Sequence, residues 1–190
     1  MSVLIFIDQA DGHVKKAAYE AMSYGAAVAA QLGTSAEGVV LGPVSDDLAA
    51  LGKYGVKKIH HVNNPALDHF DAQVFTKVIA QVVESTGAQV VVFSNNVDGK
   101  GIAPRLAARL KAGLVPGAVS LPETGNGFVV KKNVFSGKAF ANIAVNSPIK
   151  IISVNPNSYP VKEGEGTDEV AAFNATVDAP KVKVTATNKV

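Results

Sequence analysis

Short apolar runs alternate with longer segments of helical periodicity along the first half of the chain. Continuous runs bounded by turn residues are typical of strands buried on both faces, and a period of three to four is typical of helices that cover them. The pattern predicts strands at residues 3–7, 38–41, 57–62 and 89–94, and helices at residues 14–32, 46–51, 72–85 and after 98. This alternation indicates an α/β fold of three layers, with a parallel sheet between helices on both faces.

The pattern changes after Gly113, where glycine, proline and asparagine break the chain into short apolar segments. Residues 128–135 and 138–145 are two such segments, and the short Ser-Gly link between them favours a β-hairpin. We expect this β-rich C-terminal part to extend or flank the main sheet. Beyond residue 158 the alternation is weak, and residues 182–187 are the candidate for one more edge strand.

The polar stretch SNNVDGKGIAPRLAARL, from Ser94 to Leu110, is the main candidate for a ligand site. It follows an apolar strand and opens a helix, for which Asp98 is the predicted N-cap and Pro104 suits the first turn. A loop with glycines at this place in an open parallel sheet is where anions bind. The candidate residues for holding a phosphate are Asn96, Gly99, Lys100 and Gly101.

The known phosphate-binding patterns are incomplete in this stretch. G-x-G-x-x-G would need a glycine where Pro104 stands. G-x-x-x-x-G-K-[ST] would need a glycine at Ser94 and a hydroxyl residue at Gly101. A phosphate loop and a purely structural loop therefore both remain possible interpretations of these residues.

Composition narrows the function classes. The chain has 190 residues, 47% of them hydrophobic and 18% charged, with a net charge of +2, which is typical of a globular protein and gives no support to nucleic-acid binding. Its lack of cysteine excludes disulfides, thiolate metal ligands and cysteine nucleophiles. The apolar runs are too short for membrane insertion and no signal peptide is recognisable, so we expect a soluble, cytoplasmic protein.

No catalytic or metal-binding constellation is apparent. The four histidines lack the spacing of metal ligands, and His60 and His61 lie in a predicted strand that would point them to opposite faces. The aspartates, including Asp8, read as strand-end, cap or turn residues, and the serines lack the setting of a nucleophile elbow. We expect no metal and no catalytic residue.

Taken in order, several segments resemble the N-terminal domain of the electron transfer flavoprotein α subunit over about the first 160 residues. They are SVLIFID, KKAAYEAMSYGAAVAAQLG, VVFSNNVDGKGIAPRLAARL, VVKKNVFSGKAFANI and IKIISVNPNSY. Shared features include a P-R-x-A-A helix beginning at Pro104 and an aromatic-x-G hairpin at residues 135–137. The chain departs from the family at Lys131 or Lys132 and at Asn155, where an arginine is usual, so bidentate guanidinium contacts there are not expected.

The resemblance implies an adenine nucleotide α-hydrolase-like fold for residues 1–160, with 161–190 as a linker or edge segment leading to an FAD-binding domain beyond residue 190. It implies a heterodimer with the β subunit, in which this domain is the scaffold and docking unit. The intact protein would be an electron carrier, not a stand-alone enzyme. It would take electrons from flavin dehydrogenases, hold them on FAD and pass them to a quinone reductase or another acceptor.

The resemblance also bears on the loop at Asn96 to Gly101. In that family the β subunit's equivalent loop holds AMP and the α subunit's usually does not. A degenerate phosphate loop is therefore expected here, and no cofactor is expected on this chain alone.

Two other function classes compete with this interpretation. A small nucleotide-binding module resembling universal stress proteins would need a glycine-rich phosphate loop near the end of the chain, where only Gly164 and Gly166 stand, in an acidic setting. A stand-alone enzyme would need a polar cluster in the crevice at the carboxyl edge of the sheet.

Overall fold

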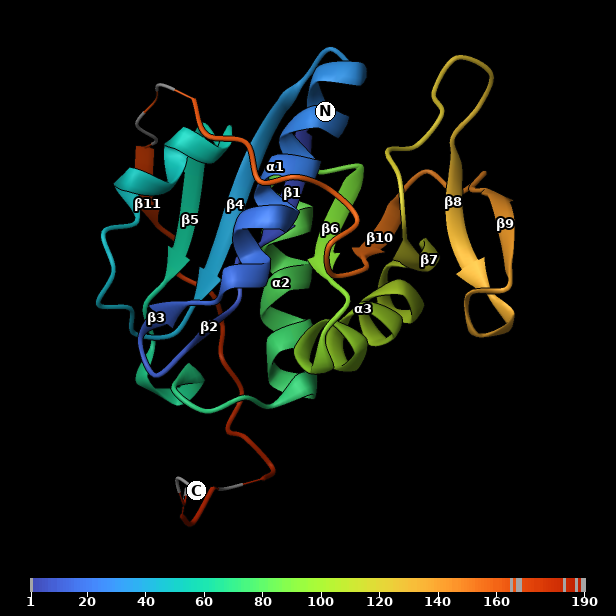
Figure 1. Ribbon diagram of the computed structural model, residues 1–190. Helices are drawn as coiled ribbons and strands as arrows, with labels where there is room; N and C mark the ends of the chain where they lie inside the picture. The colour runs from blue at the N-terminus through green and yellow to red at the C-terminus, as the bar shows by residue number, and fades with distance from the viewer. Residues whose placement is uncertain (1, 165, 167–168, 183, 187, 189–190) are drawn as a thin grey trace.

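The computed structural model describes residues 2–164, 166, 169–182, 184–186 and 188. A nine-stranded sheet runs through the molecule in the order β11-β5-β4-β1-β6-β10-β7-β8-β9 (Figure 1). The strands of this sheet are β1 (Ser2–Phe6), β4 (Ser35–Leu41), β5 (Lys58–Val62), β6 (Val90–Ser94), β7 (Gly113–Ala118), β8 (Val129–Val134), β9 (Ala139–Ala144), β10 (Lys150–Val154) and β11 (Glu169–Ala172). The strands from β11 to β7 are parallel and the β8–β9 hairpin is antiparallel, which confirms the α/β class.

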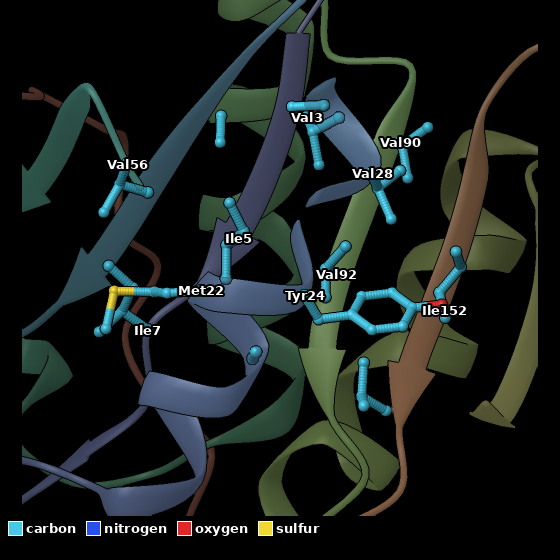
Figure 2. Close-up of a cluster of buried hydrophobic side chains, with 14 of the residues drawn as sticks. Val3, Ile5, Ile7, Met22, Tyr24, Val28, Val56, Val90, Val92 and Ile152 are labelled. Carbon is cyan, nitrogen blue, oxygen red and sulfur yellow. The ribbon is translucent and has the colours of Figure 1, made fainter. Parts of the chain in front are cut away.

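Helices cover both faces of the sheet. They are α1 (Lys16–Gln31), α2 (Ala72–Thr86) and α3 (Val97–Leu110), with short 3-10 helices η1 (Ala49–Tyr54), η2 (Pro65–Leu67) and η3 (Phe135–Gly137). Alternate residues of β1 pack on the two faces of the sheet, because successive side chains of a strand point to opposite sides. Val3 and Ile5 pack in the cluster that contains α1, and Leu4 and Phe6 pack in the cluster that contains α2 and α3. Figure 2 shows Val3 and Ile5 beside Tyr24 and other buried side chains of the α1 face.

The ends of α1 and α2 follow the expected residue types. Asp71 caps α2 by accepting hydrogen bonds from the Gln73 and Val74 amides, and Gly87 ends the helix at a positive φ of 64°. α1 begins at Lys16 and not at Val14, because His13–Val14 (β3) pairs with Gln9–Ala10 (β2) in a small hairpin. Gly33 follows α1 in the left-handed conformation, with a φ of 63° that glycine adopts without strain.

The helix expected at residues 46–51 is wrong in its position. The 3-10 helix η1 occupies Ala49–Tyr54 instead, and the Asp47 side chain accepts from the Ala49 amide just ahead of it. Asp46 lies ahead of this helix, where its carboxylate accepts from the Val14 amide and pairs with His13.

The C-terminal part contributes more to the main sheet than the sequence pattern indicates. β10 lies between β6 and β7 as a parallel strand, and the β8–β9 hairpin extends the sheet at one end. After β10 the chain crosses the α1 face, where the Lys162 amide donates to Ser23 Oγ, and β11 then closes the opposite edge beside β5. The edge strand expected at 182–187 includes residues 183 and 187, which lie outside the described residues, and the rest of that stretch is not in a strand.

Candidate functional site

The candidate site lies at the carboxyl ends of β1 and β6. After β1 the chain builds β4 and β5 on one side, and it then returns through α2 to place β6 on the other side of β1 (Figure 1). In open α/β sheets ligands bind where the strand order reverses in this way. Asp8 follows β1 here, and Asn95 and Asn96 lead from β6 into α3.

Asn96 connects these segments. Its side-chain Oδ1 accepts from the Gly99 amide at 3.0 Å, and its Nδ2 donates to Asp8 Oδ2 at 2.6 Å. Asn96 is therefore the N-cap of α3, and the prediction of Asp98 as the cap is wrong. Asp98 lies in the first turn, where its carboxylate pairs with Lys15 instead.

Asp8 is the most deeply buried acid of the site, with 2% of its surface exposed. Burial raises the pKa of its carboxyl group, although the hydrogen bond from Asn96 and the charge of Lys15, 3.8 Å away, act to lower it. The Ser94 hydroxyl lies 3.5 Å from Asp8 Oδ1 and donates at 3.1 Å to the Ala17 carbonyl. The sequence analysis assigned Asp8 only to a strand end and did not predict that it accepts a hydrogen bond from Asn96. The available signal was an aspartate directly after a fully apolar strand.

The glycines of the stretch are helical residues, not part of an open loop. A Cβ built on Gly99 would lie 1.9 Å from the Ser94 carbonyl oxygen, so a glycine is needed for the close approach of two backbone segments. Gly101 faces Phe70, with 3.3 Å between its built Cβ and the ring. Lys100 is exposed on the surface of α3.

Pro104 lies well inside α3, so its predicted place in the first turn is wrong. The helix starts earlier than expected because Asn96 provides the cap. Ile102 and Leu106 are fully buried and form the core face of this helix.

Two carboxyl groups of the protein lie at the N-terminus of α3, beside Lys15. The N-terminus of a helix favours negative charge, and here the carboxylate of Asp98 supplies it in the first turn. Asp8 adds a second carboxyl group, linked through Asn96 to the same helix end. The adjoining cavity, bordered by Phe70, Lys15 and Val184, measures about 260 Å³, which is small for a nucleotide.

The two strand histidines lie in β5 and have different partners. His60 Nε2 lies 2.7 Å from Glu37 Oε2, and His61 Nε2 lies 2.9 Å from the Gly42 carbonyl oxygen. Within the described ranges, no group of three or more His, Asp or Glu side chains is arranged to hold a metal ion. Likewise, none of the helices described is both long and apolar enough to span a membrane.

The β8–β9 hairpin is a second feature with functional potential. It stands at the end of the sheet, away from the helices (Figure 1), and turns through Phe135, Ser136 and Gly137, all with positive φ. Phe135 is 80% exposed and Phe140 is 60% exposed. From residue 129 to 144 the sequence contains three lysines and no acid. Exposed aromatic side chains on a hairpin are typical of a surface that binds another protein.

Comparison with known proteins gives a consistent result. The model of the electron transfer flavoprotein domain family matches residues 3–178. The electron transfer flavoprotein subunit alpha of Bacillus subtilis is 28% identical over 166 residues, covering 85% of this chain and 49% of the relative. The protein FixB of Clostridium saccharobutylicum is 26% identical, covering 96% of this chain and 54% of the relative.

A third relative has a more specialised name. The acryloyl-CoA reductase electron transfer subunit beta of Anaerotignum propionicum is 28% identical over 128 residues, covering 67% of this chain and 35% of the relative. The chain thus spans about half the length, or less, of the curated relatives it matches.

Proposed function

This chain belongs to the electron transfer flavoprotein domain family, and from that premise we propose that it is the N-terminal scaffold and docking domain of an α subunit. In this proposal the intact protein is an electron carrier, not a stand-alone enzyme. It takes electrons from flavin dehydrogenases, holds them on FAD and delivers them to a quinone reductase or another acceptor. The FAD belongs to a further domain, to which the chain leads after β11 at the edge of the sheet.

The observation that carries the docking role is the exposed β8–β9 hairpin. A phenylalanine with 80% of its surface in water contributes little to the folding of this chain, so its burial requires a partner. Lys131 Nζ lies 4.3 Å from the ring centre of Phe140, which keeps a positive charge on the same patch. We assign this patch to the β subunit of the electron transfer flavoprotein.

The loop from Asn96 to Gly101 has a structural role in this proposal. The Asn96 side chain is engaged by Gly99 and Asp8, and Gly99 is pressed against Ser94. These contacts support a degenerate phosphate loop, and they give no preference to the nucleotide-binding module that resembles universal stress proteins.

Binding to the β subunit tests the docking role. We expect a 1:1 complex by calorimetry with the β subunit from the same organism. The double variant Phe135→Asn, Phe140→Thr should weaken the complex at least about 30-fold, because buried aromatic anchors dominate interface energies. Asn tolerates the positive φ of 51° at position 135 and Thr suits a strand, so both changes should leave the fold intact.

Val97→Ala is the matched control, because Val97 is 81% exposed at the start of α3, away from the hairpin. It should change the affinity less than threefold. Equal affinity of the hairpin variant and the unchanged chain would contradict the assigned surface, and failure to form any complex would contradict the docking role itself.

The cofactor assignment has its own test. The purified chain is denatured, and the supernatant is chromatographed against FAD, AMP and ATP standards. We expect none of the three at stoichiometric amounts. AMP or ATP at one equivalent would show the loop to be a true nucleotide site, and FAD at one equivalent would overturn the placement of the flavin in a further domain.

A further inference from the structure

The segment after β11 continues as an extended strap over α2. Exposed and partly buried positions alternate from residue 171 to 178, so that every second side chain faces the domain. Phe173, Ala175 and Val177 are the inward residues, and they pack against the cluster on the α2 face. The Phe173 ring meets His60 edge-on, with 6.1 Å between the ring centres.

The strap is attached mainly through side chains of α2. Gln81 accepts from the Thr176 amide at 2.9 Å and donates to the Thr176 carbonyl oxygen at 2.9 Å, so one amide side chain replaces a strand partner. Lys77 pairs with Asp178 two residues further on. In the part of the chain that the structure describes, the main chain of residues 174–178 makes hydrogen bonds with Gln81 alone.

The packing beneath the strap is incomplete. A cavity of about 140 Å³ remains between the strap and the carboxyl end of β5, bordered by His61, Asn63 and Ala175 among others. A segment with few buried contacts and solvent-exposed hydrogen bonds opens at a lower free energy than the core. β11 differs, because it pairs with β5 along its length.

We propose that residues 173–178 form a strap that opens and closes on α2 while the rest of the domain stays folded, with Gln81 as its positioning residue. When the strap is closed, the chain beyond Asp178 starts from a fixed point beside α2, and its residue Val184 borders the cavity at the candidate site. When it is open, that starting point moves back to the end of β11. The strap is thus a conformational joint, and this inference does not depend on the proposed function.

Native-state hydrogen exchange of the whole chain, followed by NMR in low concentrations of urea, tests the proposal. The Phe173 amide donates to the His61 carbonyl oxygen and not to Gln81, so it reports on the strap without being bonded to the mutated side chain. We expect it to exchange faster than the Val92 amide in the core, with little dependence on urea. Gln81→Ala should raise its exchange rate roughly threefold to tenfold, as expected for the loss of two exposed hydrogen bonds.

Gln73→Ala is the control, because Gln73 is an exposed glutamine near the start of the same helix. It should leave the exchange of the Phe173 amide unchanged. If the Phe173 and Val92 amides show the same exchange free energy and the same urea dependence, the strap opens only when the whole domain unfolds. That result, or an unchanged Phe173 rate in Gln81→Ala, would overturn the proposal.

Discussion

Replacing Gly99 by alanine is expected to destabilise the domain by about 3 kcal/mol or more. The added methyl group would lie 1.9 Å from the Ser94 carbonyl oxygen and 3.1 Å from its carbon, and both atoms belong to the backbone. A backbone cannot rotate away as a side chain can, so the end of β6 or the first turn of α3 must move. Overpacking of a well-packed interior costs about 1–3 kcal/mol and sometimes more. Because the Ser94 backbone is rigid, we expect a cost at the upper end of this range.

The measurement is equilibrium unfolding in urea, with Gly101→Ala as the matched control. Gly101 lies two residues further along the same helix, and its built Cβ would be 3.3 Å from Phe70, a ring that is 40% exposed and can shift. Alanine favours the helix over glycine by up to about 1 kcal/mol, so this variant should be neutral or slightly more stable. Equal effects of the two variants would contradict a structural role for Gly99, since a glycine kept only for a ligand could be replaced without loss of stability.

Much of the fold follows from apolar periodicity. The run from Val3 to Ile7 could be predicted as a strand buried on both faces because every residue of it is apolar, and the structure buries it completely. Gly87 could be recognised as a helix end because it follows the last residue of a periodic segment. Local patterns of this kind depend on neighbours within one turn or one strand, which a sequence displays directly.

The remaining features depend on contacts between distant segments. The central place of β10 could not be predicted, because periodicity does not give the order of strands in a sheet. The strap was missed because its inward positions alternate small and large residues, with Ala175 between Phe173 and Val177, which weakens the apolar signal. Asn96 and not Asp98 caps the helix because the side-chain amide of Asn96 also donates to Asp8. Asp8 is distant in sequence, so this contact is not visible in the local pattern.

Replacing Asp8 by alanine should destabilise the domain by about 2–3 kcal/mol, because the Asn96 Nδ2 group would lose its buried acceptor. Asp8→Asn is the conservative variant. Its amide oxygen can still accept from Asn96, and Lys15 keeps its other partner, Asp98, so the loss at neutral pH should be within about 1 kcal/mol. A similar loss in both variants would show that the charge of Asp8, and not its hydrogen bond, stabilises this end of the sheet.

The pH dependence of the same variants separates charge from hydrogen bonding. Burial raises the pKa of Asp8 in the folded state above its ordinary value of 3.8, so the folded protein takes up this proton at a higher pH than the unfolded chain does. The free energy of unfolding of the unchanged protein should therefore rise relative to that of Asp8→Asn as the pH falls from 7 through the folded-state pKa. The difference should level off below pH 3.8, where Asp8 is protonated in both the folded and the unfolded state.

Other acids, such as Asp46 and Asp178 with their lowered pKa values, titrate alike in the two proteins and cancel in the comparison. Unfolding in urea at a series of pH values measures this difference, and parallel curves for the two proteins would mean that the Asp8 carboxyl group is not desolvated as its burial requires.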